Sequence, residues 1–500
     1  MTSRKTMAVL ALTLAMMLSA GAALAATPMQ GWNVTYGTGS ITAADAAAVS
    51  IASNKAILQG SALSLTGAQS LTVNFTAPST SRFGNAALFR VTGNDKSTIE
   101  GNITVTGGAM FLVNRNGIVF GGGSVVTAPA FFATTLNISD AQFKAFTPTN
   151  SSADAWTMAF AAEPGTAGTI DLRDTAKLVT TPSVGGNEGG VIALMAKSIN
   201  VAAGVTISAP NGTVMLMAAK QVTMSQSGSG NYGMFNIAYN TQTGNTITNS
   251  GTLDIRDTSS QGGGSVILVG DSVTHSGTIL APTRGDPSDP NTQKVSRILL
   301  VASGDVNVTS SSTTDASAAG NNRAGYVGII AGGTATVESG AKIYAKGNGN
   351  DGGAVIIDGN SLAVSQTADI NVSAPARTAG TVTKTANGGG DLSAQVEYAR
   401  LAIRPNGDKM VLLNDGTLNL PPILPPSIKQ EAQSFLSSTM KPAGGAPGTG
   451  TSPGTGPGDF KPADLKNPPS SVQSGDGKGG PTNSGPQGKD TTDNKDRTDK

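Results

Sequence analysis

One short segment of the chain returns almost unchanged, and this repetition limits the folds that the sequence can adopt. The segment Ile247–Leu253 comes back as Val273–Ile279, 26 residues later. Looser copies lie at Val201–Ile207 and at Val337–Ile343. Repeats of about 20–50 residues are typical of solenoid proteins, in which each repeat packs only on its neighbours.

A second repeated element is a glycine followed by an apolar strand. It occurs at Gly190–Leu194, Gly264–Leu268, Gly325–Ile329 and Gly353–Ile357. The spacing between copies varies, which a solenoid with three short strands per coil tolerates in its loops. The composition agrees, because the chain has 65 glycines but only 4% aromatic and 13% charged residues. We therefore predict an all-β fold, a right-handed parallel β-helix.

The first 25 residues have the pattern of an export signal. Arg4 and Lys5 precede an apolar run from Met7 to Leu18, and Ala23–Ala25 offers a cleavage site of small residues. The run is shorter than the about 20 apolar residues that span a membrane, and no later stretch qualifies. We expect a signal peptide at 1–25, an exported protein, and no transmembrane segment of its own.

The C-terminal part of the chain departs from the strand pattern. Residues 421–440 begin with two proline pairs and continue into a short segment with a helical capping box and one apolar face. We predict a short helix there that caps the open end of the solenoid. Residues 441–500 are rich in glycine and proline, and we expect them to form a disordered tail.

The chain has no cysteine, although exported proteins often carry disulfides. Two explanations stay open. A chain that crosses a second membrane unfolded would be locked by a periplasmic disulfide, whereas a repetitive β-structure simply needs no such cross-link.

The most specific part of the sequence lies between residues 83 and 143. Four blocks follow one another there: Leu88–Gly93, Ser97–Ile103, Ala109–Gly121 and Ala133–Asp140. In their order they resemble the N-terminal secretion domain of filamentous-haemagglutinin-like exoproteins, which use two-partner secretion. The resemblance covers about residues 30–145, so we expect such a domain at 26–150 and a β-helix repeat region at 151–420.

The resemblance implies a secretion motif at Asn114, Arg115, Asn116, Gly117 and Ile118. In this family an Asn-Pro-Asn-Gly-Ile turn follows an apolar strand, and here Arg115 takes the place of the proline. Asparagines at such a turn also hydrogen-bond the backbone, which is the simpler physical role. The two roles are compatible, because loss of the turn would disrupt the domain that the transporter handles.

The resemblance also implies a partner and a destination. The partner is a separate outer-membrane β-barrel transporter of a Gram-negative cell, whose periplasmic domains bind the N-terminal region. The protein would pass through the periplasm to the cell surface or the medium. It would act there as an adhesin, by attachment to a receptor on a host cell or another surface, with glycans as one class of receptor.

Residues that could carry catalysis are scattered. Asp171 and Asp174 flank Arg173, which is typical of turn and surface charge, and the only histidine, His275, takes the repeat position of Asn249. The segment Gly347–Gly353 is a single irregular copy of a calcium-binding pattern and is better interpreted as a loop. We predict no catalytic residue, no metal, no cofactor and no enzyme activity.

Two alternatives to an adhesin stay open. One is an extracellular scaffold or matrix protein, and the less favoured one is a carbohydrate-active β-helix enzyme. The net charge of +1 gives no case for binding nucleic acid.

Overall fold

The structure is a computed structural model of the 500-residue chain. It describes residues 27–78, 85–146, 157–163, 168–181, 189–226, 235–256, 264–282, 296–318, 324–348, 352–374, 379–386, 399–403 and 409–414. The predicted signal peptide, the Pro-rich segment with its helix at 421–440, and the predicted tail at 441–500 lie outside these residues.

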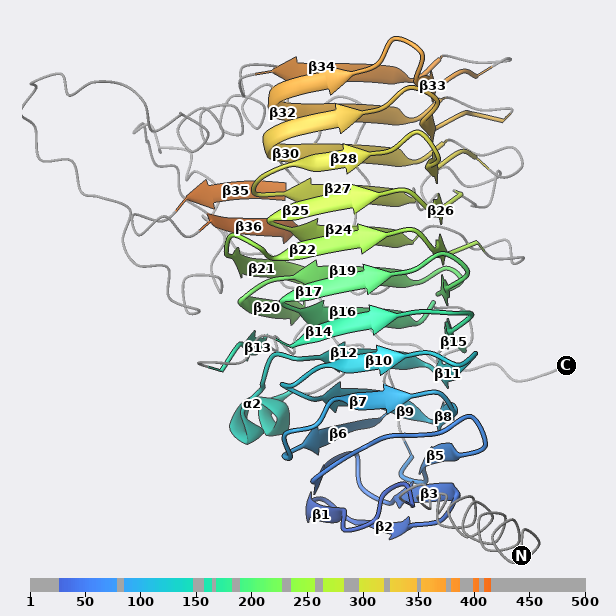
Figure 1. The fold of residues 1–500 in the computed structure, drawn as a ribbon, viewed down its shortest axis with the longest axis vertical. Coiled ribbons are helices and arrows are strands. Elements are labelled where there is room, and N and C mark those ends of the chain that lie inside the picture. Colours follow the sequence, from blue (N-terminus) through green and yellow to red (C-terminus); the bar gives the residue numbers. More distant parts are fainter. Residues whose placement is uncertain are drawn as a thin grey trace, which may run out of the picture. The chain divides into compact units, whose positions relative to one another are not determined.

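The basic unit of the fold is a coil of three short strands. In one coil the chain passes through β16 (Val191–Ala196), β17 (Ser198–Val201) and β18 (Thr206–Ser208). It then enters β19 (Thr213–Ala218), which pairs in parallel with β16 so that Val214 lies beside Ile192. Repetition of this path produces three parallel ladders, which we call the first, second and third faces (Figure 1).

Each face continues the strands of that coil in both directions. The other strands of the first face are β4 (Lys55–Gly60), β6 (Asn85–Val91), β9 (Gly108–Val113), β12 (Ala130–Thr134), β24 (Ser265–Gly270), β27 (Arg297–Ala302), the first parts of β30 (Tyr326–Val337) and β32 (Ala354–Val364), and β34 (Thr381–Ala386). Those of the second face are β7 (Ser97–Ile99), β10 (Ile118–Phe120), β14 (Thr169–Leu172), β22 (Thr246–Asn249), β25 (Ser272–His275), β28 (Val306–Val308) and the second parts of β30 and β32. Those of the third face are β3 (Ala46–Ile51), β5 (Ser70–Phe75), β8 (Asn102–Thr106), β11 (Val125–Ala128), β15 (Lys177–Thr180), β23 (Thr252–Asp254), β26 (Thr278–Leu280), β29 (Thr313–Asp315), β31 (Lys342–Tyr344) and β33 (Asp369–Asn371).

This architecture confirms the predicted all-β solenoid, a parallel β-helix. The sequence repeats lie beside one another in register on neighbouring coils. Ile247 pairs with Val273 and Asn249 with His275 on the second face, and Leu253 pairs with Ile279 on the third. The repeated glycine-and-strand elements form β16, β24, β30 and β32, which all belong to the first face.

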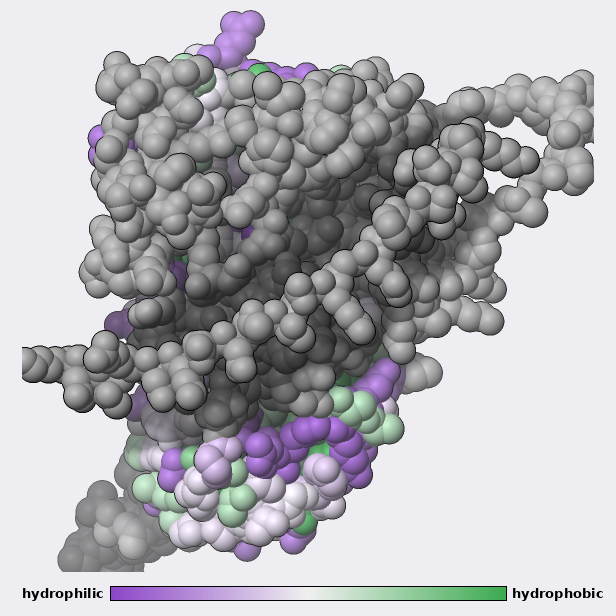
Figure 2. Space-filling view, turned by 180° about the vertical axis from the view of Figure 1, so that it is seen from behind, coloured by the Kyte–Doolittle hydropathy of each residue, from purple (hydrophilic) through white to green (hydrophobic). Residues whose placement is uncertain are grey.

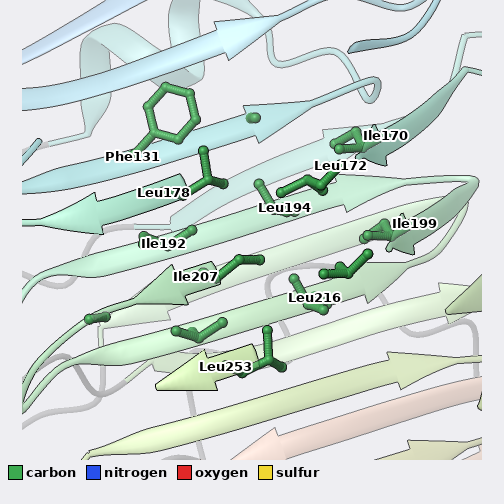
Figure 3. Packing of buried hydrophobic residues seen from close by; sticks show 14 of the residues in the cluster. Phe131, Ile170, Leu172, Leu178, Ile192, Leu194, Ile199, Ile207, Leu216 and Leu253 are labelled. Carbon is green, nitrogen blue, oxygen red and sulfur yellow. The ribbon is translucent and has the colours of Figure 1, made fainter. Parts of the chain in front are cut away.

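Alternate side chains of all three faces point into one shared apolar interior. Ile192 and Leu194 come from the first face, Ile199 from the second and Ile207 from the third, and each is buried. Figure 3 shows such residues stacked coil upon coil. Burial of this continuous column is what the repeated apolar positions of the sequence supply.

The first face is buried on its outer side as well. Strands such as β16 and β24 have no exposed residue, and their outward side chains form a second apolar cluster with the elements that cover them. Those elements are the helix α2 (Asp140–Ala145) and the strands β13 (Thr157–Ala161), β20 (Gln221–Gln226) and β21 (Phe235–Thr241). They leave the solenoid between β12 and β14 and between β19 and β22, which is one reason for the variable repeat spacing.

The covering strands form an antiparallel sheet of their own, which we call the outer sheet. Its order is β13-β20-β21-β36-β35, and its last two strands are β35 (Ala399–Ile403) and β36 (Lys409–Asn414). The outer sheet was not predicted from the sequence.

The N-terminal end of the β-helix is closed by two antiparallel strands. β1 (Asn33–Tyr36) pairs with β4, and β2 (Gly39–Thr42) pairs with β3. Trp32 lies against Gly60, where an added Cβ would meet the indole ring at 2.4 Å, and its Nε1 donates a hydrogen bond to the Ala62 carbonyl. Antiparallel pairing of this kind covers strand edges that would otherwise accept another chain.

The interior of the β-helix holds a small polar cluster at the matched repeats. The side chains of Asn249 and His275 are fully buried and lie 3.1 Å apart, and His275 Nε2 lies 3.5 Å from the carbonyl oxygen of Thr313. Burial lowers the pKa of His275 from 6.5 to about 4. The imidazole of His275 is thus neutral inside the fold at neutral pH. The pairing of the two residues on neighbouring coils confirms that His275 takes the repeat position of Asn249.

We expect His275 to destabilise the protein as the medium becomes acidic. Its pKa is lower in the fold than in the unfolded chain, so the unfolded chain binds the proton first, and stability is lost between about pH 6.5 and about 4. The loss should reach about 3 kcal/mol. Denaturant unfolding of the wild type and of His275→Asn at several pH values should show a difference that grows in this window. A constant difference would contradict the assignment.

A second buried group, Asp358, changes the stability with pH in the opposite direction. Its effect is the same in the wild type and in His275→Asn, so it cancels in the difference between them. Burial raises the pKa of Asp358, on β32, to about 7. Its contribution to stability therefore increases as the pH falls, equally in both proteins.

Candidate functional site

The predicted secretion motif forms the corner between the first and second faces. The chain leaves β9 at Val113, turns through Asn114 to Gly117, and enters β10 at Ile118. Ile118 is fully buried and lies between Ser97 of the preceding coil and Ile170 of the following coil. The motif residues thus come together at one corner, as their contiguity requires.

Asn114 ties three successive coils together. Its Nδ2 donates to the Asp95 carbonyl and to Ser97 Oγ of the preceding coil, both at 3.0 Å. Its backbone N–H donates to the carbonyl of Thr134, at the end of β12 in the following coil. The side chain is completely buried, so these hydrogen bonds replace all contact with water.

Asn116 and Gly117 complete the turn. The Asn116 backbone N–H donates to Asn114 Oδ1 at 3.0 Å, and Asn116 Nδ2 donates to the Gly93 carbonyl of the preceding coil at 2.7 Å. Gly117 has a φ of +130°, and a Cβ there would lie 3.1 Å from the carbonyl oxygen of Thr169. Only glycine satisfies both the backbone conformation and the close approach of the next coil.

Arg115 connects the corner to the outer sheet. Its guanidinium forms an ion pair with Glu163 at 2.9 Å, and the other Glu163 oxygen accepts from Asn137 Nδ2 at 2.7 Å. Asn137 also exchanges two backbone hydrogen bonds with Ala161 at the end of β13. The side chains of Arg115 and Glu163 remain 39% and 35% exposed, so solvent weakens the ion pair.

A second ion pair joins the first and the last sequence blocks. Arg90 on β6 forms an ion pair with Asp140 at 2.6 Å and donates to the Ile138 carbonyl, at the start of α2. Ser139 caps this helix by accepting from the Gln142 N–H. The helix in turn packs Phe143 edge-on against Phe111, with ring centroids 5.5 Å apart.

The region around this corner matches a known family. Residues 67–281 match the family described as TPS secretion domain, in which TPS denotes two-partner secretion. The chain carries a two-partner secretion domain. The match includes the corner, α2 and the first three strands of the outer sheet.

One solved structure is similar to the chain over a large part of its length. It is the crystal structure of the HMW1 secretion domain from Haemophilus influenzae, with 17% sequence identity and a TM-score of 0.48. The similarity covers 70% of this chain and 93% of that one. No curated protein matches the chain.

A two-partner secretion domain indicates an exoprotein that is secreted by this route and implies an outer-membrane transporter as its partner, and proteins with this domain are exported to the cell surface or the medium. The family is an exoprotein domain and not a known family of enzymes. Among the described residues, no helix has both the length and the apolar character needed to cross a membrane.

Two charged pairs outside the corner of the secretion domain lie at or just beyond the ends of strands. Arg173 and Asp174 are 54% and 59% exposed and 4.0 Å apart, and Arg256 binds the carboxylate of Asp254 two residues away. In the part of the chain that the structure describes, no group of three or more His, Cys, Asp or Glu side chains could hold a metal ion. The interpretation of Arg173 and Asp174 as turn and surface charge is confirmed, whereas Asp171 lies within β14 and is half-buried.

Sequence reasoning did not find the two ion pairs of the secretion domain. Glu163 lies 48 residues from Arg115, in a stretch without a motif, and nothing in the sequence marks it as the partner. Arg90 and Asp140 both lie in the quoted blocks, but their pairing depends on α2. The available signal was Ser139-Asp140 before Phe143, which has the form of a helix N-terminus.

We expect Asn114 to contribute more to stability than Asn116. Asn114→Ala leaves the backbone N–H of Asn116 and the Asp95 carbonyl without their bonds inside the fold, which should cost about 3 kcal/mol. Asn116 is half-buried, and Asn116→Ala should cost about 1 kcal/mol. The matched control Arg115→Ala removes a partly exposed ion pair and should cost less than about 1 kcal/mol. Chemical denaturation of the four proteins measures this order, and equal losses would contradict it.

Proposed function

We propose that the protein is an adhesin-like exoprotein that a separate outer-membrane β-barrel transporter exports, and that it acts by attachment and not by catalysis. The observation that carries the proposal is the corner at residues 114–118. It lies within the matched secretion domain and holds three coils together. The chain would cross the periplasm after removal of a signal peptide at 1–25.

The hydrogen bonds of the corner suggest how the motif serves export. The side chain of Asn114 finds its partners only when the preceding coil has formed, and its backbone N–H requires the following one. Coils that emerge from the transporter would therefore fold in sequence, each on the last. Because folding outside the membrane removes unfolded chain, it favours forward transport.

The motif residues would then act mainly through the fold. Asn114 and Ile118 are buried, whereas Arg115 and Asn116 are half-buried and reach the surface of the corner. We propose that direct recognition by the transporter, where it involves this motif, uses these two partly accessible residues. Arg115 presents a cation where the family usually has proline.

The outer surface of the second face suits a neutral, hydroxyl-rich receptor. Neighbouring coils place short polar residues beside one another there, in the column Asn200, Thr248, Thr274, Asn307 and Thr336. Hydroxyl and amide groups both donate and accept hydrogen bonds, and they repeat at about 4.8 Å from coil to coil. A glycan, which offers repeated hydroxyl groups, is the receptor class that this column fits.

The exposed surface gives little support to a permanent apolar partner. Among the described residues the exposed large hydrophobic side chains are Tyr36, at 39%, and Val382, at 40%. The described coils visible in Figure 2 carry mostly hydrophilic and intermediate residues. Such a surface fits a protein that meets its receptor in water.

The division of the chain into a secretion domain at 26–150 and a repeat region at 151–420 remains a proposal. The parallel ladders cross residue 150 without interruption, because β12 pairs directly with β16. The family match likewise extends to residue 281. The segments 421–440 and 441–500 stay proposed as a capping segment and a tail.

Fractionation of producing cells tests the proposal. An antibody measures the amount of protein in the periplasm, on the surface and in the medium. The proteins compared are the wild type, Arg115→Ala and Asn114→Ala. We expect the first two outside the cell and Asn114→Ala degraded or held in the periplasm. Cells that lose the surface protein should also lose adherence to a host-cell layer. A wild-type protein that stays soluble in the periplasm would overturn the proposed export, and unchanged adherence would overturn the adhesin role.

A further inference from the structure

The outer sheet contains one strand pair that comes from a distant part of the chain. β13, β20 and β21 belong to excursions between early coils, and they are complete at Thr241. The next strand, β36, begins at Lys409, 168 residues later. All the coils from β22 to β34 lie between the two in the sequence.

β36 covers the outer edge of β21 from Asn236 to Thr241. Six residue pairs join them in antiparallel register, from Asn236 with Asn414 to Thr241 with Lys409. β35 pairs with β36 and with no other described strand, so the hairpin of β35 and β36 is attached to the sheet through β21 alone.

The position of β21 is set by contacts other than those with the hairpin. Ile237 and Tyr239 are buried in the second apolar cluster, on the outer side of the first face. Met217 of the first face and Val222 of β20 belong to the same cluster. β21 also pairs with β20 from Phe235 to Asn240. These contacts position the strand without residues 409–414, which pair with its outer edge.

If the chain is exported in order from its N-terminus, as the proposed function requires, β21 leaves the cell before β36 does. During this interval the outer edge of β21 has no strand of its own chain to pair with. An open strand edge is a pairing site for any extended chain nearby. The neighbour present throughout the interval is the transporter. The acceptor strand lies within the matched secretion domain at 67–281, whereas the hairpin that closes it lies outside that region.

We propose that the outer edge of β21 is a strand-acceptor site, which pairs with an extended strand of the transporter during export and is closed by β36 once residues 399–414 have crossed. Closure by the chain's own strand displaces the transporter strand. Export of the β35–β36 hairpin thus releases the chain from the transporter.

The direct test blocks closure in the full chain with Val411→Pro/Leu412→Pro. Backbone N–H groups of consecutive strand residues point to opposite neighbours, so one of the two prolines removes a donor to β21. Thr455→Pro/Gly456→Pro, far outside the hairpin, is the matched control. The probe is a fluorescent synthetic peptide of residues 397–416, and its anisotropy reports binding.

We expect the peptide to bind Val411→Pro/Leu412→Pro at least about tenfold more tightly than the wild type or the control. The same peptide carrying both prolines should not bind. Absence of binding to a variant that keeps the wild-type circular dichroism would overturn the acceptor site. A variant that forms dimers in gel filtration would identify a second copy, and not the transporter, as the occupant, and would contradict the proposal.

A cysteine pair provides a test that does not disturb the strand. Ala238 lies opposite Leu412, and the chain has no cysteine of its own. In Ala238→Cys/Leu412→Cys, released protein in the medium should carry the disulfide, and protein still attached to cells should have free thiols. Identical redox states in the two fractions would overturn closure as the releasing step.

Cell fractionation separates failure of this proposal from failure of the proposed export. With Val411→Pro/Leu412→Pro, we expect protein on the cell surface and a several-fold loss from the medium. If the variant is released like the wild type, closure by β36 is wrong while export stands. If neither protein leaves the periplasm, the proposed function itself fails, and the acceptor role toward the transporter fails with it.

Discussion

The backbone hydrogen bonds between neighbouring coils are the interaction on which the rest of the structure depends. Each strand of the β-helix satisfies its N–H and C=O groups only through the coil before it and the coil after it. This requirement keeps the apolar positions in register, as Ile192 with Val214 shows, and it makes one side of each strand face the common interior. It also leaves strand edges wherever a ladder begins or a covering sheet ends, and these edges account for β1, β2 and the hairpin of β35 and β36.

The corner at residues 114–118 is the place where this stacking depends on side chains. The buried side chain of Asn114 donates its hydrogen bonds to the preceding coil, and Gly117 lets the following coil approach closely. The same corner carries Arg115, whose ion pair with Glu163 links the β-helix to its outer sheet. The predicted secretion motif is thus, in physical terms, a set of contacts that hold successive coils together. The role in export that we propose for it follows from this role in folding.

The fold was predictable because its determinants are local and repeated. The 26-residue offset between Ile247 and Val273 corresponds to one coil, and it could be read without knowledge of any distant contact. The common position of the predicted motif residues at one corner was predictable for a different reason, since they are contiguous. Their roles were only partly predictable, because the partners Asp95 and Gly93 act through backbone carbonyls that no sequence pattern marks.

The outer sheet was not predictable from the same signals. Its strands pair across long separations, such as β21 with β36, and register between distant strands is not encoded in local periodicity. One indication was present in the first face, where Ala109–Val113 is apolar without alternation, as expected for a strand buried on both sides. That pattern shows that a cover exists, but it does not identify α2 and the outer sheet as the cover.

Hydrogen exchange at the corner tests the central claim most directly. The amide of Asn116 bonds to the side chain of Asn114 and not to a strand partner, so its protection reports whether this side chain is in place. Amide exchange of the folded protein should show Asn116 and Ser97 as slowly exchanging as the adjacent strands β9 and β10, and Asn114→Ala should expose both while distant coils keep their protection. Fast exchange of Asn116 in the wild type would contradict an account in which this corner holds the coils together.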